Sequence, residues 1–209
     1  GNLAARLAGV KNVVSFVTGL GSLYVENDFK VKVIRSVVEI VLRQVFKHSQ
    51  YVVFQNHEDY AYFSSKRIIK KEQGLVILGS GIDTDLWQSA DAQQVSNAEV
   101  KVLMASRLIK HKGVSDYLDA AKRLRAKSVK AKFLLAGQID QGNPYALRME
   151  ELKNCPGVEY LGFVEDMKNL LEQVDVFVYP SYYKEGVPRA LIEAASMGKA
   201  IVTTDNVGC

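Results

Sequence analysis

Residues 99–209 alternate between short apolar runs and amphipathic stretches, and this alternation limits the possible folds more than any other feature. The apolar runs are continuous, as is typical of strands buried on both faces. We expect strands at Val100–Met104, Phe133–Ala136, Glu159–Leu161, Val176–Tyr179 and Ala200–Thr203. Helices are expected between them at Val114–Arg125, Tyr145–Lys153, Met167–Gln173 and Arg189–Met197. Repeated strand–helix units predict an α/β fold, a parallel sheet covered by helices on both faces.

The first ninety residues repeat this pattern less regularly. We expect strands at Val13–Val17, Tyr51–Gln55 and Val76–Leu78, and helices at Asn2–Ala8, Phe29–Lys47 and Asp59–Arg67. Ser89–Asn97 is small and polar without periodicity, which is typical of a linker. The sequence therefore predicts two doubly wound, Rossmann-like domains at 1–88 and 99–209, joined by a linker at 89–98. The chain starts inside an expected helix and stops after an expected strand, so we expect both domains to be incomplete.

Composition narrows the partners and the compartment. The net charge of +4 fits an anionic ligand or an anionic membrane surface and is too small to indicate nucleic acid. Cys155 and Cys209 form no CxxC pair, and no apolar run is long enough to span a bilayer, so we expect a cytoplasmic protein. His48, His57 and His111 lack metal-ligand spacing and are expected at the surface.

The basic helix expected at Phe29–Lys47 has two interpretations. Its apolar residues can cover a core beneath a solvated basic face. Alternatively, the helix can lie on an anionic bilayer at the inner face of the cytoplasmic membrane.

Unusual residues follow the expected strands of the second half. Arg107 and Lys112 follow the first strand, Gly137 the second, Gly162-Phe163 the third and Pro180–Arg189 the fourth. Parallel sheets of this kind bind ligands at the carboxyl ends of their strands, so we expect one site to gather these residues.

The segment Glu185–Arg189 leads into an expected helix with Pro188 at its start. A helix N-terminus beside a glycine binds anions such as a diphosphate, and Arg107 and Lys112 can neutralise the same charge. Glu193, eight residues after Glu185, is suited to ribose hydroxyls. Two isolated glutamates more often lie on a solvated helix face, and Thr18–Gly21 can equally be a tight turn.

Taken together, these segments resemble the retaining GT-B glycosyltransferases of family GT4. Glu185 and Glu193 match the family's EX7E motif, within the closely similar stretch PSYYKEGVPRALIEAASMGKAIVTTDNVG. Arg107 with Lys112-Gly113, and Gly79–Asp83 at the domain junction, match as well. VTGLG at 17–21 and FQNHED at 54–59 resemble a bacterial subgroup that builds capsule, O-antigen or lipid-linked glycans.

The resemblance implies a role for each matching residue. Arg107 and Lys112 would bind the donor diphosphate, and Glu185 would contact the donor sugar. The remaining donor-binding residues would be Gly186, Val187, Pro188, Arg189, Glu193, Phe163, Val164 and Gly137. Thr18, Gly19 and Gly21 would form a sugar or acceptor loop. Many relatives place a histidine in that loop and this chain has none, so no catalytic base is assigned.

The resemblance also implies the reaction. A sugar would pass from a nucleoside diphosphate donor, UDP in our reading, to a glycan or polyprenol-linked acceptor, without a metal or other cofactor. Two alternatives stay open at this point: a GT-B enzyme resembling UDP-sugar 2-epimerases, and a non-catalytic nucleotide-sugar-binding module.

Overall fold

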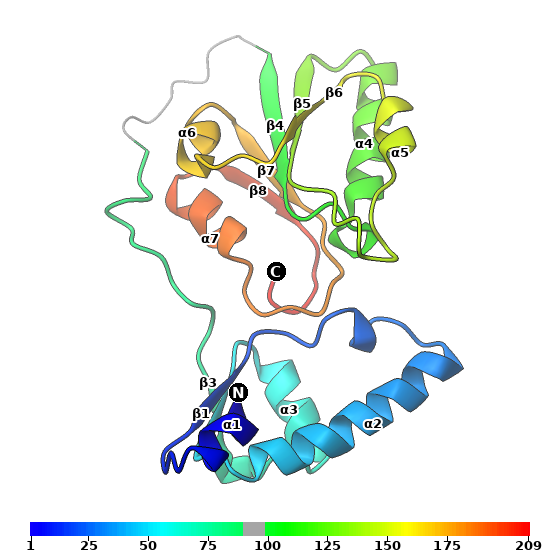
Figure 1. Ribbon diagram of the computed structural model, residues 1–209. Coiled ribbons are helices and arrows are strands. Elements are labelled where there is room, and N and C mark those ends of the chain that lie inside the picture. Colours follow the sequence, from blue (N-terminus) through cyan, green and yellow to red (C-terminus); the bar gives the residue numbers. More distant parts are fainter. Residues whose placement is uncertain (90–98) are drawn as a thin grey trace. The chain divides into compact units, whose positions relative to one another are not determined.

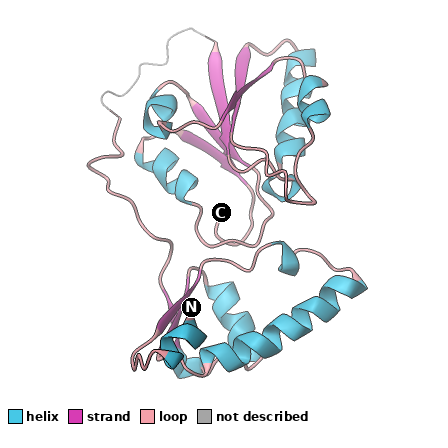
Figure 2. Cartoon of the chain, viewed as in Figure 1, coloured by secondary structure: helices cyan, strands magenta, loops and turns pink. Residues whose placement is uncertain are grey.

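The computed structural model describes residues 1–89 and 99–209, which form two compact units. Unit 1 contains Gly1–Gly81 together with Tyr183–Pro188 and Gly208. Unit 2 contains Ile82–Tyr182, Arg189–Val207 and Cys209. The linker expected at 89–98 lies outside the described residues except for Ser89. Figure 1 labels the elements, and Figure 2 colours them by type.

Unit 1 is built on a three-stranded parallel sheet in the order β1-β2-β3. The strands are β1 (Val14–Val17), β2 (Tyr51–Phe54) and β3 (Gly74–Val76). Its helices are α1 (Asn2–Leu7), α2 (Phe29–Phe46) and α3 (His57–Ser65), with 3-10 turns η1 (Ser22–Tyr24) and η2 (Lys71–Gln73). The strands and helices expected in this half are confirmed with one displacement: β3 lies two residues before the expected Val76–Leu78 and shares only Val76 with it. Helix α3 likewise begins and ends two residues before its expected bounds.

One face of the unit 1 sheet forms a core, and on the other face the residues beside the buried Val53 are exposed. Val52 and Phe54 of β2 pack with Phe46 of α2 and Phe63 of α3. On the opposite face, Phe16 lies in register with buried Val53, yet its side chain is 63% exposed. The period of two along each strand separates these faces.

Helix α2 does not cover a core along its whole length, as the first interpretation of its sequence would require. Phe46 is its only fully buried residue. Six of its large apolar side chains are exposed: Phe29, Val33, Ile34, Val37, Ile40 and Val41. Arg35 instead turns inward and donates to the carbonyls of Leu23 and Glu26. Only the last turns of α2 contribute to the core, where Leu42 and Val45 pack beside Phe46.

Unit 2 contains a five-stranded sheet in the order β6-β5-β4-β7-β8, with every pair parallel. The strands are β4 (Val100–Ala105), β5 (Ala131–Ala136), β6 (Val158–Gly162), β7 (Val176–Tyr179) and β8 (Ala200–Thr203). The helices are α4 (Val114–Ala126), α5 (Met149–Lys153), α6 (Met167–Glu172) and α7 (Arg189–Ser196), with a 3-10 turn η3 (Lys110–Lys112). The α/β prediction with parallel sheets is confirmed.

Helices cover both faces of the unit 2 sheet at its central strands, whereas the edge strand β8 is exposed. Successive residues of β4 belong to different cores: Leu103 packs toward α6 and α7, and Met104 packs toward α4. Figure 1 shows α4 and α5 on the opposite side of this sheet from α6 and α7. Trp87 belongs to the first core, where its carbonyl accepts a hydrogen bond from Ser196.

The helix expected at Tyr145–Lys153 begins only at Met149. Its first part pairs with the segment after β4 instead. The Lys110 amide donates to the Tyr145 carbonyl at 2.9 Å, and the Leu147 amide donates to the Leu108 carbonyl at 2.9 Å. These hydrogen bonds across the fold replace the local helical ones.

Candidate functional site

The strand order of unit 2 contains one topological switch point. The chain runs outward from β4 through β5 to β6 and then returns to β7 on the other side of β4. Parallel sheets bind ligands outside the carboxyl ends of the two strands at such a point. Here those ends carry the segments after Ala105 and after Tyr179.

Lys112 lies at this switch point. Its side chain comes from the loop after β4 and is buried, with Nζ donating to the Tyr179 hydroxyl of β7 at 2.8 Å. The ammonium also lies 5.2 Å from the centre of the Tyr179 ring, a cation–π distance. A buried ammonium requires such partners, so the tyrosine fixes a positive charge between β4 and β7. The sequence offers no sign of this partner, because Tyr179 reads as an ordinary core strand residue.

The glycine after Lys112 allows the two loops to meet. Gly113 has a φ of +74°, and a Cβ there would collide with the Pro180 carbonyl oxygen. The neighbouring His111 carbonyl accepts a hydrogen bond from the Tyr182 amide at 3.0 Å. A glycine is required here because both the backbone angle and the close approach exclude a side chain.

His111 itself corrects a sequence expectation. Its side chain is buried rather than at the surface, with its ring 4.3 Å from that of Tyr145 and 5.7 Å from that of Tyr182. The absence of metal-ligand spacing does not place a histidine at the surface, because an imidazole ring can also be buried in the interior. Here it packs between aromatic rings of two loops.

Arg107 and Gly137 also follow the strand ends as expected. The side chain of Arg107 is 55% exposed, and its Nη1 lies 3.8 Å from the Asp140 carboxylate. Gly137 follows β5, where its amide donates to the Gly162 carbonyl at the end of β6. The ends of β5 and β6 are thus held together beside the segment that carries Arg107.

Phe163 and Val164 follow β6 and differ in their surroundings. Phe163 is 70% exposed, whereas Val164 packs against the core that contains Leu103 and Phe177. An exposed aromatic ring next to a strand end offers a face on which a base can stack.

Helix α7 brings Arg189 and Glu193 together. It begins at Arg189, directly after Pro188. The Arg189 Nε lies 2.7 Å from Glu193 Oε1, with side-chain exposures of 65% and 11%. Arg189 therefore orients a carboxylate that is otherwise nearly buried.

The other expected site residues gather inside unit 1. The Gly186 amide donates to the Thr18 carbonyl at 2.8 Å, and the Gly21 amide donates to the Lys184 carbonyl at 2.7 Å. A Cβ on Gly19 would lie 2.5 Å from the Glu185 Cα, so a side chain would disturb this contact. The Thr18–Gly21 loop and the Glu185 segment are therefore directly paired through their backbones.

Sequence reasoning missed the residues that support the Glu185 segment. Asn56 caps α3 by accepting from the Asp59 amide at 2.7 Å, and its Nδ2 lies 3.3 Å from the Glu185 carbonyl. Lys184 pairs with Glu58 at 3.1 Å. Burial raises the pKa of Asp59, against a hydrogen bond from Asn56 that lowers it. An asparagine followed three residues later by an acid at a helix start is the signal that was available.

The described part of the chain lacks two kinds of feature. Residues 1–89 and 99–209 contain no group of three or more His, Cys, Asp or Glu side chains arranged to hold a metal ion. No helix in the same ranges has the length and apolar character needed to cross a bilayer.

Comparison with known proteins identifies the family to which the chain belongs. Residues 87–209 match the family described as "Glycosyl transferases group 1". The chain is 35% identical to N,N'-diacetylbacillosaminyl-diphospho-undecaprenol alpha-1,3-N-acetylgalactosaminyltransferase of Campylobacter jejuni, over 100% of this chain and 56% of that protein. It is 26% identical to UDP-Gal:alpha-D-GlcNAc-diphosphoundecaprenol alpha-1,3-galactosyltransferase of Escherichia coli, over 98% and 54%. The chain thus spans about half the length of these relatives.

A solved structure confirms the fold. The Anabaena Alr3699/HepE protein in complex with UDP and glucose superimposes with a TM-score of 0.75 at 19% identity, over 100% of this chain and 56% of that one. The GT-B fold class expected from the sequence is confirmed.

Proposed function

Because the chain belongs to the group 1 glycosyl transferases, we propose that it carries the nucleotide-sugar site of a retaining glycosyltransferase. The enzyme transfers the sugar of a UDP-sugar donor to a polyprenol-diphosphate-linked glycan, in the synthesis of a surface polysaccharide or glycoconjugate. The observation that carries the proposal is the Lys112 ammonium, fixed on Tyr179 at the switch point of the unit 2 sheet.

The donor diphosphate is the natural ligand of that charge. When the bond between the sugar C1 and the diphosphate oxygen breaks, negative charge develops on the leaving UDP. Lys112 and Arg107 stabilise this charge, and the Val187 and Arg189 amides at the start of α7 add hydrogen bonds, since Pro188 has no N–H and the Gly186 amide already donates to Thr18. These groups supply positive charge where other transferases use a metal ion, so we propose a reaction that needs none.

The remaining donor contacts follow from the same placement. We assign the ribose hydroxyls to Glu193, whose carboxylate Arg189 orients. Phe163 and Val164 flank the base, Gly137 lines the site beside them, and Glu185 contacts the sugar hydroxyls. The acceptor hydroxyl attacks the face from which UDP leaves, and a donor phosphate oxygen takes its proton, so no side-chain base is required.

We assign the acceptor side of the site to Thr18, Gly19 and Gly21. Their loop is paired with the Glu185 segment in unit 1, so it borders the residue assigned to the donor sugar. A polyprenol-linked acceptor fits the names of the two relatives above, both of which act on undecaprenol-linked substrates.

Such an acceptor would bring the protein to the cytoplasmic face of a membrane. Helix α2 is the surface that we assign to this contact. Its exposed apolar side chains extend from Phe29 to Val41, and exposed Lys30 and Lys32 lie at the N-terminal end of the same helix. An apolar face with flanking lysines is suited to the boundary between headgroups and acyl chains of an anionic bilayer.

The test is thermal-shift binding of UDP, GDP and ADP to the full-length protein. UDP at about a hundred times its dissociation constant should add roughly 2.7 kcal/mol of stability. Arg107→Ala and Glu193→Gln should weaken the shift, and Lys127→Ala, an exposed lysine of the same unit, should leave it unchanged. A GDP shift without a UDP shift would change the donor but keep the class.

Turnover provides the second part of the test. The wild type should release free UDP only when an acceptor is present, and Lys112→Met should lower kcat by about 100-fold or more. A cooperatively folded protein that binds no nucleoside diphosphate would refute the proposal.

A further inference from the structure

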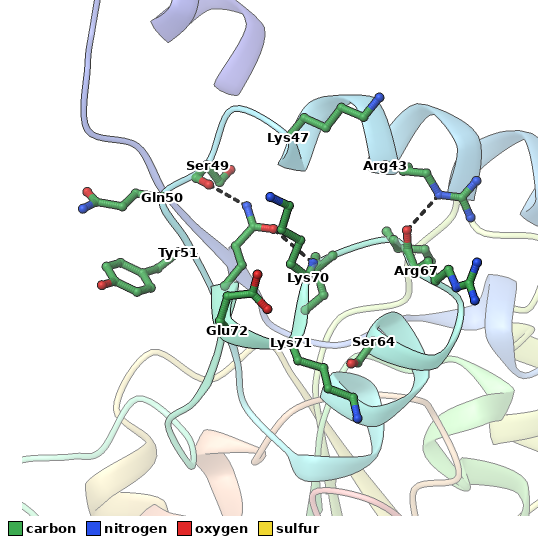
Figure 3. Close-up of a pocket in the computed structure, with 13 residues that line it drawn as sticks. Arg43, Lys47, Ser49, Gln50, Tyr51, Ser64, Arg67, Lys70, Lys71 and Glu72 are labelled. Carbon is green, nitrogen blue, oxygen red and sulfur yellow. Dashed lines mark hydrogen bonds between the residues drawn. The ribbon is translucent and has the colours of Figure 1, made fainter.

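Unit 1 contains a pocket of about 1180 Å³ that the donor site does not use. Its walls come from the end of α2, the segment after α3 and the η2 turn. Figure 3 shows the labelled side chains around it. Lining residues Gln50 and Gln73 immediately precede β2 and β3, so the pocket lies at the amino-terminal edge of the sheet. Gly19 and Gln55 follow the carboxyl ends of β1 and β2, at the opposite edge.

The lining is strongly basic. It contains Arg43, Lys47, Arg67, Lys70 and Lys71, against the single acid Glu72. Within residues 1–89 and 99–209, none of these five cations forms an ion pair. Like charges gathered without counter-charges repel one another, so this surface is predisposed to bind an anion.

Interactions with helix ends account for only some of these five cations. Arg43 donates to the carbonyls of Lys66 and Arg67 at 2.8 and 2.9 Å, and thereby joins α2 to the segment after α3. Cations near helix C-termini also offset the negative end of the helix dipole. Lys70 and Lys71 follow neither helix end directly, and no described group hydrogen-bonds to their side-chain ammonium groups.

The turn that carries these two lysines is nevertheless fixed. Gln73 Nε2 donates to the carbonyls of Phe46 and Ser49 at 2.6 and 2.5 Å, which ties η2 to the end of α2. Arg67 adopts a φ of +54°, a conformation that is uncommon for a residue with a side chain. The backbone therefore holds the lysines beside Arg43 and Lys47 before any ligand arrives.

We propose that this pocket is a second anion site, which binds the phosphate groups of a ligand other than the sugar donor. The volume exceeds the need of a single phosphate ion, and cations from three segments suit a ligand with several phosphate groups or a row of phosphodiesters. The same chemistry is offered by a soluble polyphosphorylated molecule and by the headgroups of an anionic bilayer. The proposal stands on unit 1 alone and does not depend on the proposed function.

The experiment uses full-length protein with saturating UDP, so that the donor site is occupied. One arm measures inorganic tripolyphosphate binding by titration calorimetry, and the other measures sedimentation with phosphatidylglycerol vesicles against phosphatidylcholine vesicles. The test variant is Lys47→Gln/Lys70→Gln/Lys71→Gln, which leaves Arg43 and its hydrogen bonds intact. The matched control is Lys127→Gln/Lys130→Gln/Lys153→Gln, which removes three exposed lysines from unit 2.

The triple variant should bind its ligand roughly 100-fold more weakly, and the control should bind as the wild type does. A loss confined to tripolyphosphate supports the pocket as a site for a soluble ligand. A loss confined to phosphatidylglycerol vesicles supports it as a headgroup site. Equal binding by all three proteins, or binding of neither probe by the wild type, would overturn the proposal. A normal UDP shift in the triple variant keeps this result separate from the donor site.

Discussion

The sheets of the two units are both parallel, but they are covered differently. In unit 2, Leu103 and Met104 of the same strand reach separate cores on the two faces of the sheet. In unit 1, Val52 and Phe54 reach a core, whereas Phe16 on the other face is largely exposed. An apolar strand residue therefore contributes differently to folding stability in the two units, because its burial depends on the layer that covers the strand.

The two units also differ in how they hold positive charge. Unit 2 buries Lys112 on Tyr179 at the carboxyl ends of its strands. Unit 1 gathers Lys47, Lys70 and Lys71 on an open pocket at the amino ends. A buried cation requires a hydrogen-bond partner within the protein, whereas exposed cations are stabilised by solvent and by bound ligands. We therefore expect a single substitution to disrupt the Lys112 site. Several substitutions should be needed to change anion binding at the unit 1 pocket.

The largest difference should appear between two strand phenylalanines. Phe177 in unit 2 is fully buried, and Phe177→Ala should lower the free energy of unfolding by about 3–5 kcal/mol. Phe16→Ala in unit 1 should change it by no more than about 0.5 kcal/mol. Urea unfolding of both variants provides the measurement. Equal losses would mean that the open face of the unit 1 sheet is covered in solution.

A smaller effect is expected from two glycines of unit 2 that share a left-handed backbone. Gly113 and Gly198 have φ values of +74° and +66°, but only Gly113 would place a Cβ against backbone, at Pro180. Gly113→Ala should cost about 3 kcal/mol and Gly198→Ala about 1 kcal/mol, because the second carries the conformational cost alone. Thermal unfolding compares them. Similar melting temperatures would show that the two loops do not meet as closely as described.

The smallest effect concerns pH and Asp59 in unit 1. Burial raises the pKa of Asp59 above its ordinary value of 3.8, so the folded state binds its proton more tightly than the unfolded state. The contribution to stability is therefore present below pH 3.8 and is lost as the pH rises through the raised pKa. Asp59→Asn should remove this fall, and the exposed Glu72→Gln should retain it. Unfolding free energies at a series of pH values test this, and parallel curves for the wild type and Asp59→Asn would contradict it.

Several elements could be predicted because their signals are local. The strands β4, β5 and β7 are continuous apolar runs, and the predicted positions agree with the structure to within two residues. Lys112 and Glu193 could be selected as candidates because their spacing matches a motif, and their roles in donor binding stay a proposal. Helix α5 could not be placed as well, since the Tyr145 carbonyl and the Leu147 amide form hydrogen bonds with the segment after β4.

The partners of the site residues had no comparable signal. Tyr179 and Asn56 lie far from Lys112 and Glu185 in the chain, and only folding makes them neighbours. Nor could the pattern of α2 reveal that its apolar side chains are exposed, since a helical period shows that one face is apolar and leaves open what covers it.

The sequence by itself determined the alternation of strands and helices, the parallel class of the sheets and the residue types at the ends of the strands. These properties depend on local apolar periodicity and on short motifs, both of which are written in consecutive residues. Only the tertiary structure decided which strand lies beside which, and therefore that β4 and β7 are neighbours with Lys112 held against Tyr179. The physical reason is that hydrogen bonding and burial between distant segments depend on the whole packed sheet, and no short stretch of sequence contains that information.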